Sequence, residues 1–224
     1  LSHELRSPMT NIRGFLQGML DGTIPTADYE RYLGIVLSET NRMTKLVTSL
    51  LNLSRMENDD TALSLSTFNI NELIRLVLIA KVNQIEEKGL DMQLQFEEDS
   101  SFVLADHDQI EQVLINLMDN AIKFTPHGGR IQVLTCAIDT ATMGITVQDN
   151  GIGILEQDIP YIFDRFYTAD KAHTVGQGTG LGLAICKTIL EKHHQRIEVL
   201  PRESGSAIRF TLQRAKAPLA EVAK

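Results

Sequence analysis

Residues 106–129 read DHDQIEQVLINLMDNAIKFTPHGG, and the rest of the chain is best interpreted around this stretch. Apolar side chains recur in it at intervals of three and four residues, which predicts a helix packed against a core. They are Ile110, Val113, Leu114, Leu117, Ala121 and Phe124. Asp106 or Asp108 can cap the start of this helix.

A row of polar side chains lies off this apolar stripe. Asn116, Asn120 and Lys123 are spaced i, i+4 and i+7, so they share one face of the helix. Carboxamide oxygens can ligate Mg²⁺ without adding negative charge beside an anionic nucleotide, and the ammonium would offset phosphate charge. A solvated polar face is the alternative, and the helix considered alone slightly favours it.

Composition limits the classes of protein to which the chain can belong. Its 224 residues hold one large domain or two small ones, and 21 basic against 29 acidic side chains give a net charge of −8. This charge argues against a general binder of nucleic acid or anionic membranes. Cys136 and Cys186 lack metal-site spacing, which favours two buried thiols in a reducing cytosol and leaves a disulfide open.

The chain contains no apolar run of membrane-spanning length and no signal-peptide pattern. It opens inside a motif at Leu1 without a methionine, so we expect a fragment of a longer protein. We expect this fragment to be cytoplasmic and to make no membrane contact. The sequence leaves open whether the parent protein is an integral membrane sensor.

The first part of the chain has helical periodicity. Residues 1–20 and 27–57 are predicted to form two helices joined by a Gly- and Pro-containing turn. Apolar or small side chains in the second helix step alternately by four and three residues. They are Tyr29, Leu33, Val36, Thr40, Met43, Val47 and Leu50. One hairpin cannot bury such a heptad seam, so a second copy is expected to complete a four-helix bundle in a homodimer.

The heptad pattern ends in a charged and polar stretch, which predicts a domain boundary. We expect a helical hairpin over 1–57, a linker over 58–66, an α/β domain over 67–214 and a flexible tail over 215–224. The predicted helices of the α/β domain are 71–88, the opening helix and 181–194. The predicted strands are 90–97, 102–105, 130–138, 144–148, 196–200 and 207–212. This order indicates an α+β fold with one mixed sheet covered by helices on one face.

Asp149-Asn150-Gly151-Ile152-Gly153-Ile154 closes a predicted strand with an acid followed by two glycines. Glycine permits backbone turns and close approaches that a side chain would block. A carboxylate at the strand end can accept a hydrogen bond from an exocyclic amine and so select adenine over guanine. An ordinary Asp-Asn-Gly turn is the alternative, and the motif by itself favours that alternative.

Four alternating glycines, GQGTGLG over residues 176–182, lead into the last predicted helix. They can present backbone N–H groups to phosphate, but their spacing fits neither a Walker loop nor the dinucleotide fingerprint. A mobile lid over residues 168–179, anchored by the apolar segment 162–167, is the better interpretation.

His3 is followed directly by Glu4 near the start of the first helix. A neutral imidazole is a competent nucleophile, and an adjacent carboxylate can orient its ring and draw off its proton. The ordinary alternative is an exposed surface histidine. We interpret the other histidines in that way. They are His107, His127, His173, His193 and His194.

Five short motifs in this order resemble those of the sensor histidine kinases of bacterial-type two-component systems. SHELRSPM resembles the phosphoacceptor box, NLMDNAIKFTP the N box, DNGIGI the G1 box, IFDRFY the F box and GQGTGLGLAI the G2 box. The resemblance covers nearly the whole chain. It implies a phosphoacceptor dimerisation hairpin followed by an ATP-binding domain of the GHKL type.

The resemblance also implies roles for individual residues. His3 would attack the γ-phosphate of ATP with Glu4 as its acid/base neighbour, Asn116 and Asn120 would hold Mg²⁺, and Lys123 would contact phosphate. The phosphoryl group would then pass to an aspartate on the receiver domain of a response regulator. This agrees with the physics of phosphoryl transfer, in which positioning and charge stabilisation dominate.

For the nucleotide, the resemblance implies that Phe124 and Ile154 line the adenine pocket, that Asp149 binds the adenine amine, and that lid glycines surround the phosphates. The remaining residues that it assigns to ATP binding are Gly151, Gly153, Gly178, Thr179, Gly180, Leu181 and Gly182.

Two departures from the family pattern qualify these roles. Many relatives carry Arg at the position of Thr168, so contact with the γ-phosphate falls to Arg165 or Lys171, and the sequence does not choose between them. Ser7 stands where the family's phosphatase activity is associated with Thr or Asn, so a hydroxyl for that activity is retained.

Two other classes of function compete with a kinase. The same nucleotide pocket occurs in ATP-gated conformational machines such as gyrase, mismatch-repair proteins and heat-shock chaperones, although these lack the His3 box and the heptad hairpin. The other class is a degenerate binding module that no longer turns over nucleotide. The presence of Asn120 and Asp149 argues against that class.

Overall fold

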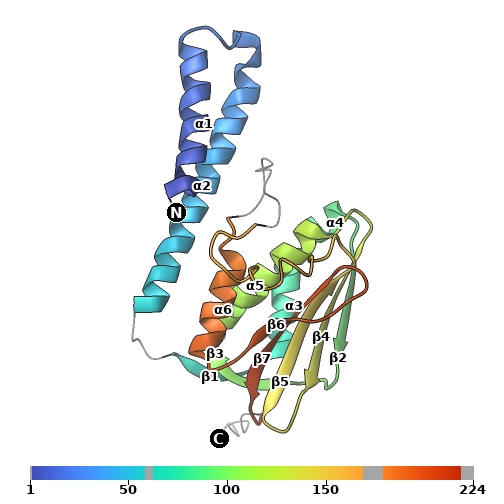
Figure 1. The fold of residues 1–224 in the computed structure, drawn as a ribbon. Coiled ribbons are helices and arrows are strands. Elements are labelled where there is room, and N and C mark those ends of the chain that lie inside the picture. Colours follow the sequence, from blue (N-terminus) through green and yellow to red (C-terminus); the bar gives the residue numbers. More distant parts are fainter. Residues whose placement is uncertain (1, 59–62, 169–178, 218–224) are drawn as a thin grey trace, which may run out of the picture. The chain divides into compact units, whose positions relative to one another are not determined.

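In a computed structural model, the described residues are 2–58, 63–168 and 179–217. The chain divides into two compact units (Figure 1). The first comprises Leu1–Asn58 with Asp164–Leu181, and the second comprises Asp59–Phe163 with Gly182–Lys224.

A helical hairpin makes up most of the first unit. Helix α1 spans Ser2–Leu20, a short 3-10 turn η1 spans Thr26–Asp28, and helix α2 spans Tyr29–Asn58. At the closed end of the hairpin, the Tyr29 hydroxyl donates to the Met19 carbonyl at 2.6 Å. The two predicted helices are therefore present and lie antiparallel, with Pro8 inside α1.

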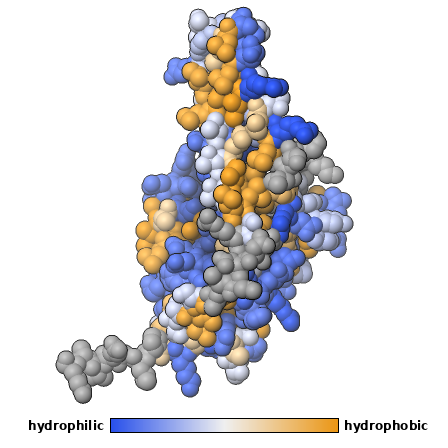
Figure 2. Space-filling model, turned by 90° about the vertical axis from the view of Figure 1, so that its left-hand side faces the viewer, coloured by the Kyte–Doolittle hydropathy of each residue, from blue (hydrophilic) through white to orange (hydrophobic). Residues whose placement is uncertain are grey.

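One face of α2 is buried and an adjacent face is exposed. Leu46 and Leu53, seven residues apart, are 1% exposed, and Glu39 lies seven residues earlier on the same face. The predicted heptad seam runs one position later, where Leu33 is 49% and Val47 is 42% exposed. Apolar side chains gather in bands along the hairpin (Figure 2). The exposed ones are Met9, Leu16, Leu20, Leu33, Leu37, Val47 and Leu51.

The second unit is a seven-stranded sheet with helices on one of its faces (Figure 1). The elements in chain order are β1 Leu65–Asn69, α3 Ile70–Ala80, α4 Val82–Glu87, β2 Asp91–Phe96, β3 Phe102–Asp106, α5 His107–Phe124, β4 Arg130–Ala137, β5 Thr142–Asp149, α6 Gly182–Lys192, β6 Ile197–Val199 and β7 Ser206–Arg214. The strand order is β1-β3-β7-β5-β4-β2, and β6 also pairs with β7. The sheet is mixed, because β2 pairs with β4 in parallel and the other pairs are antiparallel.

This architecture confirms the predicted fold class and corrects two of the predicted elements. Strand β1 was not predicted, and it begins at Leu65, inside the stretch expected to be a linker. It is an edge strand whose residues remain half-buried or exposed, so its sequence lacks a strong apolar signal. The predicted helix over 71–88 is two helices, because Lys81 leaves the helical conformation between α3 and α4.

Helix α5 packs its predicted apolar stripe on the sheet. Ile110, Leu114 and Leu117 are at most 2% exposed and belong to the same core as Phe210 of β7. Burial of each such side chain contributes roughly 1.5–3 kcal/mol. Phe124, the last member of the stripe, is the exception with 39% of its surface exposed. The core therefore fixes α5 firmly while leaving its C-terminal aromatic ring accessible.

Candidate nucleotide site

The start of α5 is fixed by its cap. The Asp106 carboxylate accepts hydrogen bonds from the backbone N–H of Gln109 at 3.2 Å and of Ser64 at 3.1 Å. Asp106, rather than Asp108, is therefore the cap. The backbone N–H of Asp106 donates to Nε2 of His193 at 3.0 Å, which ties α5 to the C-terminal end of α6.

Asn116 is held between two hydrogen bonds. Its Oδ1 accepts from Nε2 of Gln112 at 3.0 Å, and its Nδ2 donates to the carbonyl of Gly182 at 3.2 Å. Asn120 lies half-buried one turn further along the same helix. Two carboxamide oxygens one turn apart form a neutral donor set that suits Mg²⁺ bound mainly by phosphates and water. Sequence reasoning missed Gln112, whose type and spacing alone gave no signal.

Lys123 and Phe124 end the helix together. The Lys123 ammonium lies 4.7 Å from the centroid of the Phe124 ring, within the range of a cation–π contact. The pair thus presents a positive charge and an aromatic face at the C-terminal end of the polar row. A nucleotide offers the complementary groups, a polyphosphate and a planar base.

Asp149 is buried at the end of β5, with 6% of its surface exposed. Its Oδ1 accepts from the backbone N–H of Gly151 at 2.7 Å, and its Oδ2 accepts from the hydroxyl of Ser206. Ser206 is opposite Asp149 in the antiparallel pairing of β5 and β7. The sequence alone gave Ser206 no role, because only the strand register places it beside Asp149.

The glycine turn after Asp149 packs against the end of α5. A Cβ on Gly151 would lie 2.3 Å from the Phe124 carbonyl oxygen, so only glycine fits there. The turn continues through Gly153, whose φ of 77° favours glycine, to Ile154, which is half-buried. Within the second unit, the turn that follows Asp149 therefore lies directly against the C-terminal end of α5.

An open cavity of about 440 Å³ lies at this junction. Lys88, Lys123, Phe124 and Ile152 are among the residues that line it. Ile154, for which the family resemblance implied contact with adenine, follows two residues later in the same turn and is not part of this lining.

Other predicted site residues belong to the first unit. They are Arg165, Thr179, Gly180 and Leu181. The backbone N–H of Phe166 donates to the Gly180 carbonyl at 2.9 Å, and a Cβ on Gly180 would lie 2.7 Å from the Phe166 backbone. This bond joins the chain on either side of residues 169–178. Most of the predicted lid, together with Lys171 and Gly178, lies outside the described residues.

The predicted phosphoacceptor residues lie at the start of α1. His3 and Glu4 have helical backbone, and their side chains lie outside the described part of the structure. Ser7 is exposed four residues after His3 on the same helix. The helix thus places a hydroxyl about one turn from the predicted nucleophile.

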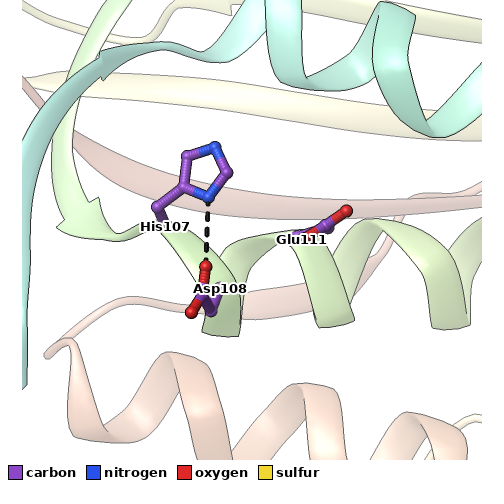
Figure 3. A group of neighbouring side chains, drawn as sticks. All are labelled: His107, Asp108 and Glu111. Atoms are coloured by element: carbon purple, nitrogen blue, oxygen red, sulfur yellow. Dashed lines mark hydrogen bonds and ion pairs between the residues drawn. The ribbon is translucent and has the colours of Figure 1, made fainter.

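His107, Asp108 and Glu111 form the cluster of potential metal ligands found among the described residues (Figure 3). Nδ1 of His107 lies 3.3 Å from Oδ1 of Asp108, and the Asp108 side chain is 94% exposed. The cluster occupies the first turns of α5, where the helix dipole disfavours a cation. We assign no metal to it.

The two cysteines differ in environment. Both are free thiols, so the disulfide that the sequence left open does not form. Cys186 is buried under α5, and burial raises the pKa of its thiol to about 12. Cys136 is exposed, so the expectation of two buried thiols is wrong for this residue.

Two family models match the chain. Residues 105–216 match the model of the histidine kinase-, DNA gyrase B- and HSP90-like ATPases, and residues 1–59 match the His kinase A phospho-acceptor domain. The ATPase match covers the site formed by α5 and Asp149 and implies ATP binding. The phospho-acceptor match covers the helical hairpin.

Whole-chain comparisons agree with these matches. Sensor protein SrrB of Staphylococcus aureus is 35% identical over 218 residues, which are 96% of this chain and 37% of SrrB. The histidine kinase AdeS of Acinetobacter baumannii superposes with a TM-score of 0.77 at 28% identity, covering 96% of this chain and 98% of that one. Histidine kinase ThkA, solved in complex with response regulator protein TrrA, gives 0.80 at 29% identity, covering 96% and 60%.

The chain therefore spans little more than a third of the length of SrrB. Among the described residues, no helix combines the length and the apolar character needed to cross a membrane. The hairpin that matches the phospho-acceptor domain, and the ATPase unit that follows it, show together that the chain belongs to the sensor histidine kinase family.

Proposed function

We propose that this chain is the catalytic core of an ATP-dependent protein-histidine kinase, which phosphorylates itself on His3 and passes the phosphoryl group to an aspartate of a response regulator. One observation carries the proposal: the turn after the buried Asp149 packs against the end of the α5 helix that bears the polar row, and the same chain carries a hairpin that matches the phospho-acceptor domain. A simple ATPase of the gyrase or chaperone type needs only the first of these features.

The proposed nucleotide site assigns each side chain a separate task. Asp149, oriented by Ser206 and Gly151, accepts a hydrogen bond from the adenine amine while the Phe124 ring packs on the base. Lys123 offsets phosphate charge. When bound, Mg²⁺ would be held by the carboxamide oxygens of Asn116 and Asn120 and would neutralise charge on the phosphates. The Asn116 oxygen has two lone pairs, so it can accept from Gln112 and ligate the metal at the same time.

The proposed transfer step uses the imidazole of His3. One ring nitrogen attacks the γ-phosphorus, the bond to the β–γ bridging oxygen breaks, and ADP leaves with the electron pair. The proton on the other ring nitrogen is drawn off by the Glu4 carboxylate. The phosphohistidine then donates the same group to a receiver aspartate. The solved complex of the similar kinase ThkA with TrrA supports a partner of this kind.

Two further features of the proposal concern the hairpin. The exposed apolar band on α1 and α2 would be covered by the hairpin of a second copy, forming a homodimeric four-helix bundle. The exposed Ser7 hydroxyl would support phosphatase activity toward the phosphorylated regulator by positioning a water molecule.

The test is incubation of the chain with γ-labelled ATP and Mg²⁺. We expect acid-labile labelling of the wild type and of His107→Gln, a matched change at a histidine away from the proposed chemistry. We expect none for His3→Gln, which lacks the nucleophile, and little for Asn120→Ala, which lacks a ligand for Mg²⁺-ATP.

Three other results would reject the proposal in different ways. Equal labelling of His3→Gln and the wild type would exclude His3 as the acceptor. Steady ADP release without any phosphoprotein would indicate a conformational ATPase. Failure of both the wild type and Asn120→Ala to bind ATP in a titration would indicate a degenerate module.

A further inference from the structure

Lys88 makes an unusual set of contacts with the C-terminal end of α5. From the chain that follows α4, its ammonium donates to the backbone carbonyls of Ile122 at 2.7 Å, Lys123 at 3.0 Å and Thr125 at 2.9 Å. The last carbonyls of a helix have no partners within that helix and need donors from elsewhere. Lys88 is therefore a C-terminal cap supplied by another element.

The backbone of Lys88 reinforces this contact. Its carbonyl accepts from the N–H of Gly128 at 2.9 Å, and the chain then reverses at Gly89, where φ is 59°. The N–H of Asp91 next donates to the Gly129 carbonyl at 2.8 Å, where the parallel pairing of β2 with β4 begins. Main-chain hydrogen bonds thus hold the backbone of Lys88 in place. Its side chain therefore starts from a fixed position close to the end of α5.

The capped turn carries two of the side chains proposed to contact the nucleotide. Lys123 and Phe124 are the last residues of α5, and Phe124 is partly exposed beside the cavity. The Asp149 turn also packs against this helix end, through Gly151 and the Phe124 carbonyl. The final turn of α5 is therefore contacted by both the Lys88 ammonium and the glycine turn.

Lys88 lines the same cavity as Lys123, but its hydrogen bonding gives it a different task. An ammonium has three N–H donors, and three backbone carbonyls occupy those of Lys88. Direct binding of phosphate would leave buried carbonyls without partners. The positive charge also offsets the negative end of the α5 dipole next to the proposed site of an anionic ligand.

We infer that Lys88 is a positioning residue for ATP: by capping α5 it fixes Lys123 and Phe124 in the orientation that binds the nucleotide. The inference rests on the proposed function. Its consequence is specific, because loss of the cap should weaken nucleotide binding while the transfer step at His3, in the other unit, proceeds normally once ATP is bound.

The test compares Lys88→Met, Lys88→Arg and Lys81→Met with the wild type. Lys88→Met keeps the length of the side chain and removes the donors. Lys88→Arg keeps the charge, but its planar fork cannot reach three carbonyls in the same way. Lys81→Met is the matched control, because Lys81 also bridges to α5, through an ion pair with Asp119 at 2.5 Å, away from the helix end.

The measurements are ATP affinity by titration and labelling rates as a function of ATP concentration. For Lys88→Met we expect the KM for ATP and the Kd of ATP to rise about tenfold, with the maximal rate within about twofold of wild type. Lys88→Arg should raise KM by about threefold, and Lys81→Met should leave it unchanged.

An unchanged KM in Lys88→Met would overturn the inference, as would a lower maximal rate at an unchanged KM. If circular dichroism shows that Lys88→Met does not fold, Lys88→Arg decides: a raised KM supports the inference and a wild-type KM overturns it. A wild type that binds ATP but takes up no label would reject the proposed function instead, and the ATP titrations would still test Lys88.

Discussion

Asp149 illustrates how a single residue acquires a task from its surroundings. Its sequence neighbours, Asn150 and Gly151, also suit an ordinary turn. In the structure the carboxylate is buried and accepts from Gly151 and Ser206, which fixes the direction of its remaining lone pairs. A buried carboxylate oriented in this way can discriminate between bases, whereas an exposed turn residue cannot.

Ser206→Ala should weaken ATP binding by about tenfold, because a hydrogen bond to a charged group is worth roughly 1.5–3 kcal/mol and its loss frees the Asp149 side chain to rotate. The measurement is a nucleotide titration. Ser204→Ala, at an exposed neighbouring position, is the control and should bind like wild type. Equal affinities for the two variants would show that Ser206 does not orient Asp149.

Cys186 should be inert to a thiol reagent at pH 8 in the folded protein, because burial and a pKa raised to about 12 leave almost no thiolate. Cys136 is exposed and should react. Titration with a chromogenic disulfide should count one thiol before unfolding and two afterwards. The folded chain also holds the Cys186 proton more tightly than the unfolded chain, so stability should fall as pH rises above 9. Two reactive thiols in the native protein would contradict this prediction.

At the scale of elements, α5 is fixed at both ends by residues outside it. Ser64 and His193 contact its first residues, and Lys88 caps its last turn. The apolar stripe buries the side facing the sheet. The polar row therefore lies on a helix that has little freedom to shift, which is what a site for positioning phosphate requires.

The turn into β7 is tightly packed at Gly205. A Cβ on Gly205 would lie 1.9 Å from the Asp149 carbonyl oxygen, and the φ of Gly205 is 70°. Gly205→Ala should therefore destabilise the second unit by more than about 2 kcal/mol. Gly89→Ala, where φ is 59° but the surrounding space is open, should cost only about 1 kcal/mol. Urea unfolding of both variants measures the difference, and similar losses would show that steric contact at Gly205 is unimportant.

At the scale of the whole molecule, the chain separates the proposed chemistry between two units. The nucleotide-binding residues of α5 and Asp149 belong to the second unit, and His3 belongs to the first. Phosphoryl transfer therefore requires an arrangement in which the two units meet. The exposed apolar band of the hairpin adds a second requirement, because such a surface is costly to leave in water.

The double variant Leu37→Asp with Leu51→Asp should be monomeric. The two leucines are 62% and 55% exposed on α2, and charges placed there would face each other across the bundle. We expect the dimer Kd to rise by at least about 100-fold, as measured by analytical ultracentrifugation. Leu76→Asp, at a comparably exposed leucine on α3, is the control and should stay dimeric. A dimer that tolerates both changes would place the interface elsewhere.

Periodic patterns made the main elements predictable. The apolar stripe of α5 and the heptads of α2 are repeated signals, each given by many residues, so both helices and the fold class follow from the sequence. Strand β1 did not follow, because a short edge strand needs few buried side chains. The heptad of α2 was also predicted only in part, because the sequence locates the repeat but not which of two adjacent faces of the helix is buried.

The sequence by itself determined the family, the fold class and the residue types proposed for the site, because motifs of that length and order are local properties of the chain. The tertiary structure decided which other side chains orient these proposed site residues. Ser206 reaches Asp149 through strand register, and Lys88, which follows α4, reaches the end of α5 through the folding of the intervening strands β2 and β3. Such contacts join residues more than thirty positions apart. No local pattern records them, because they depend on how the folded elements meet.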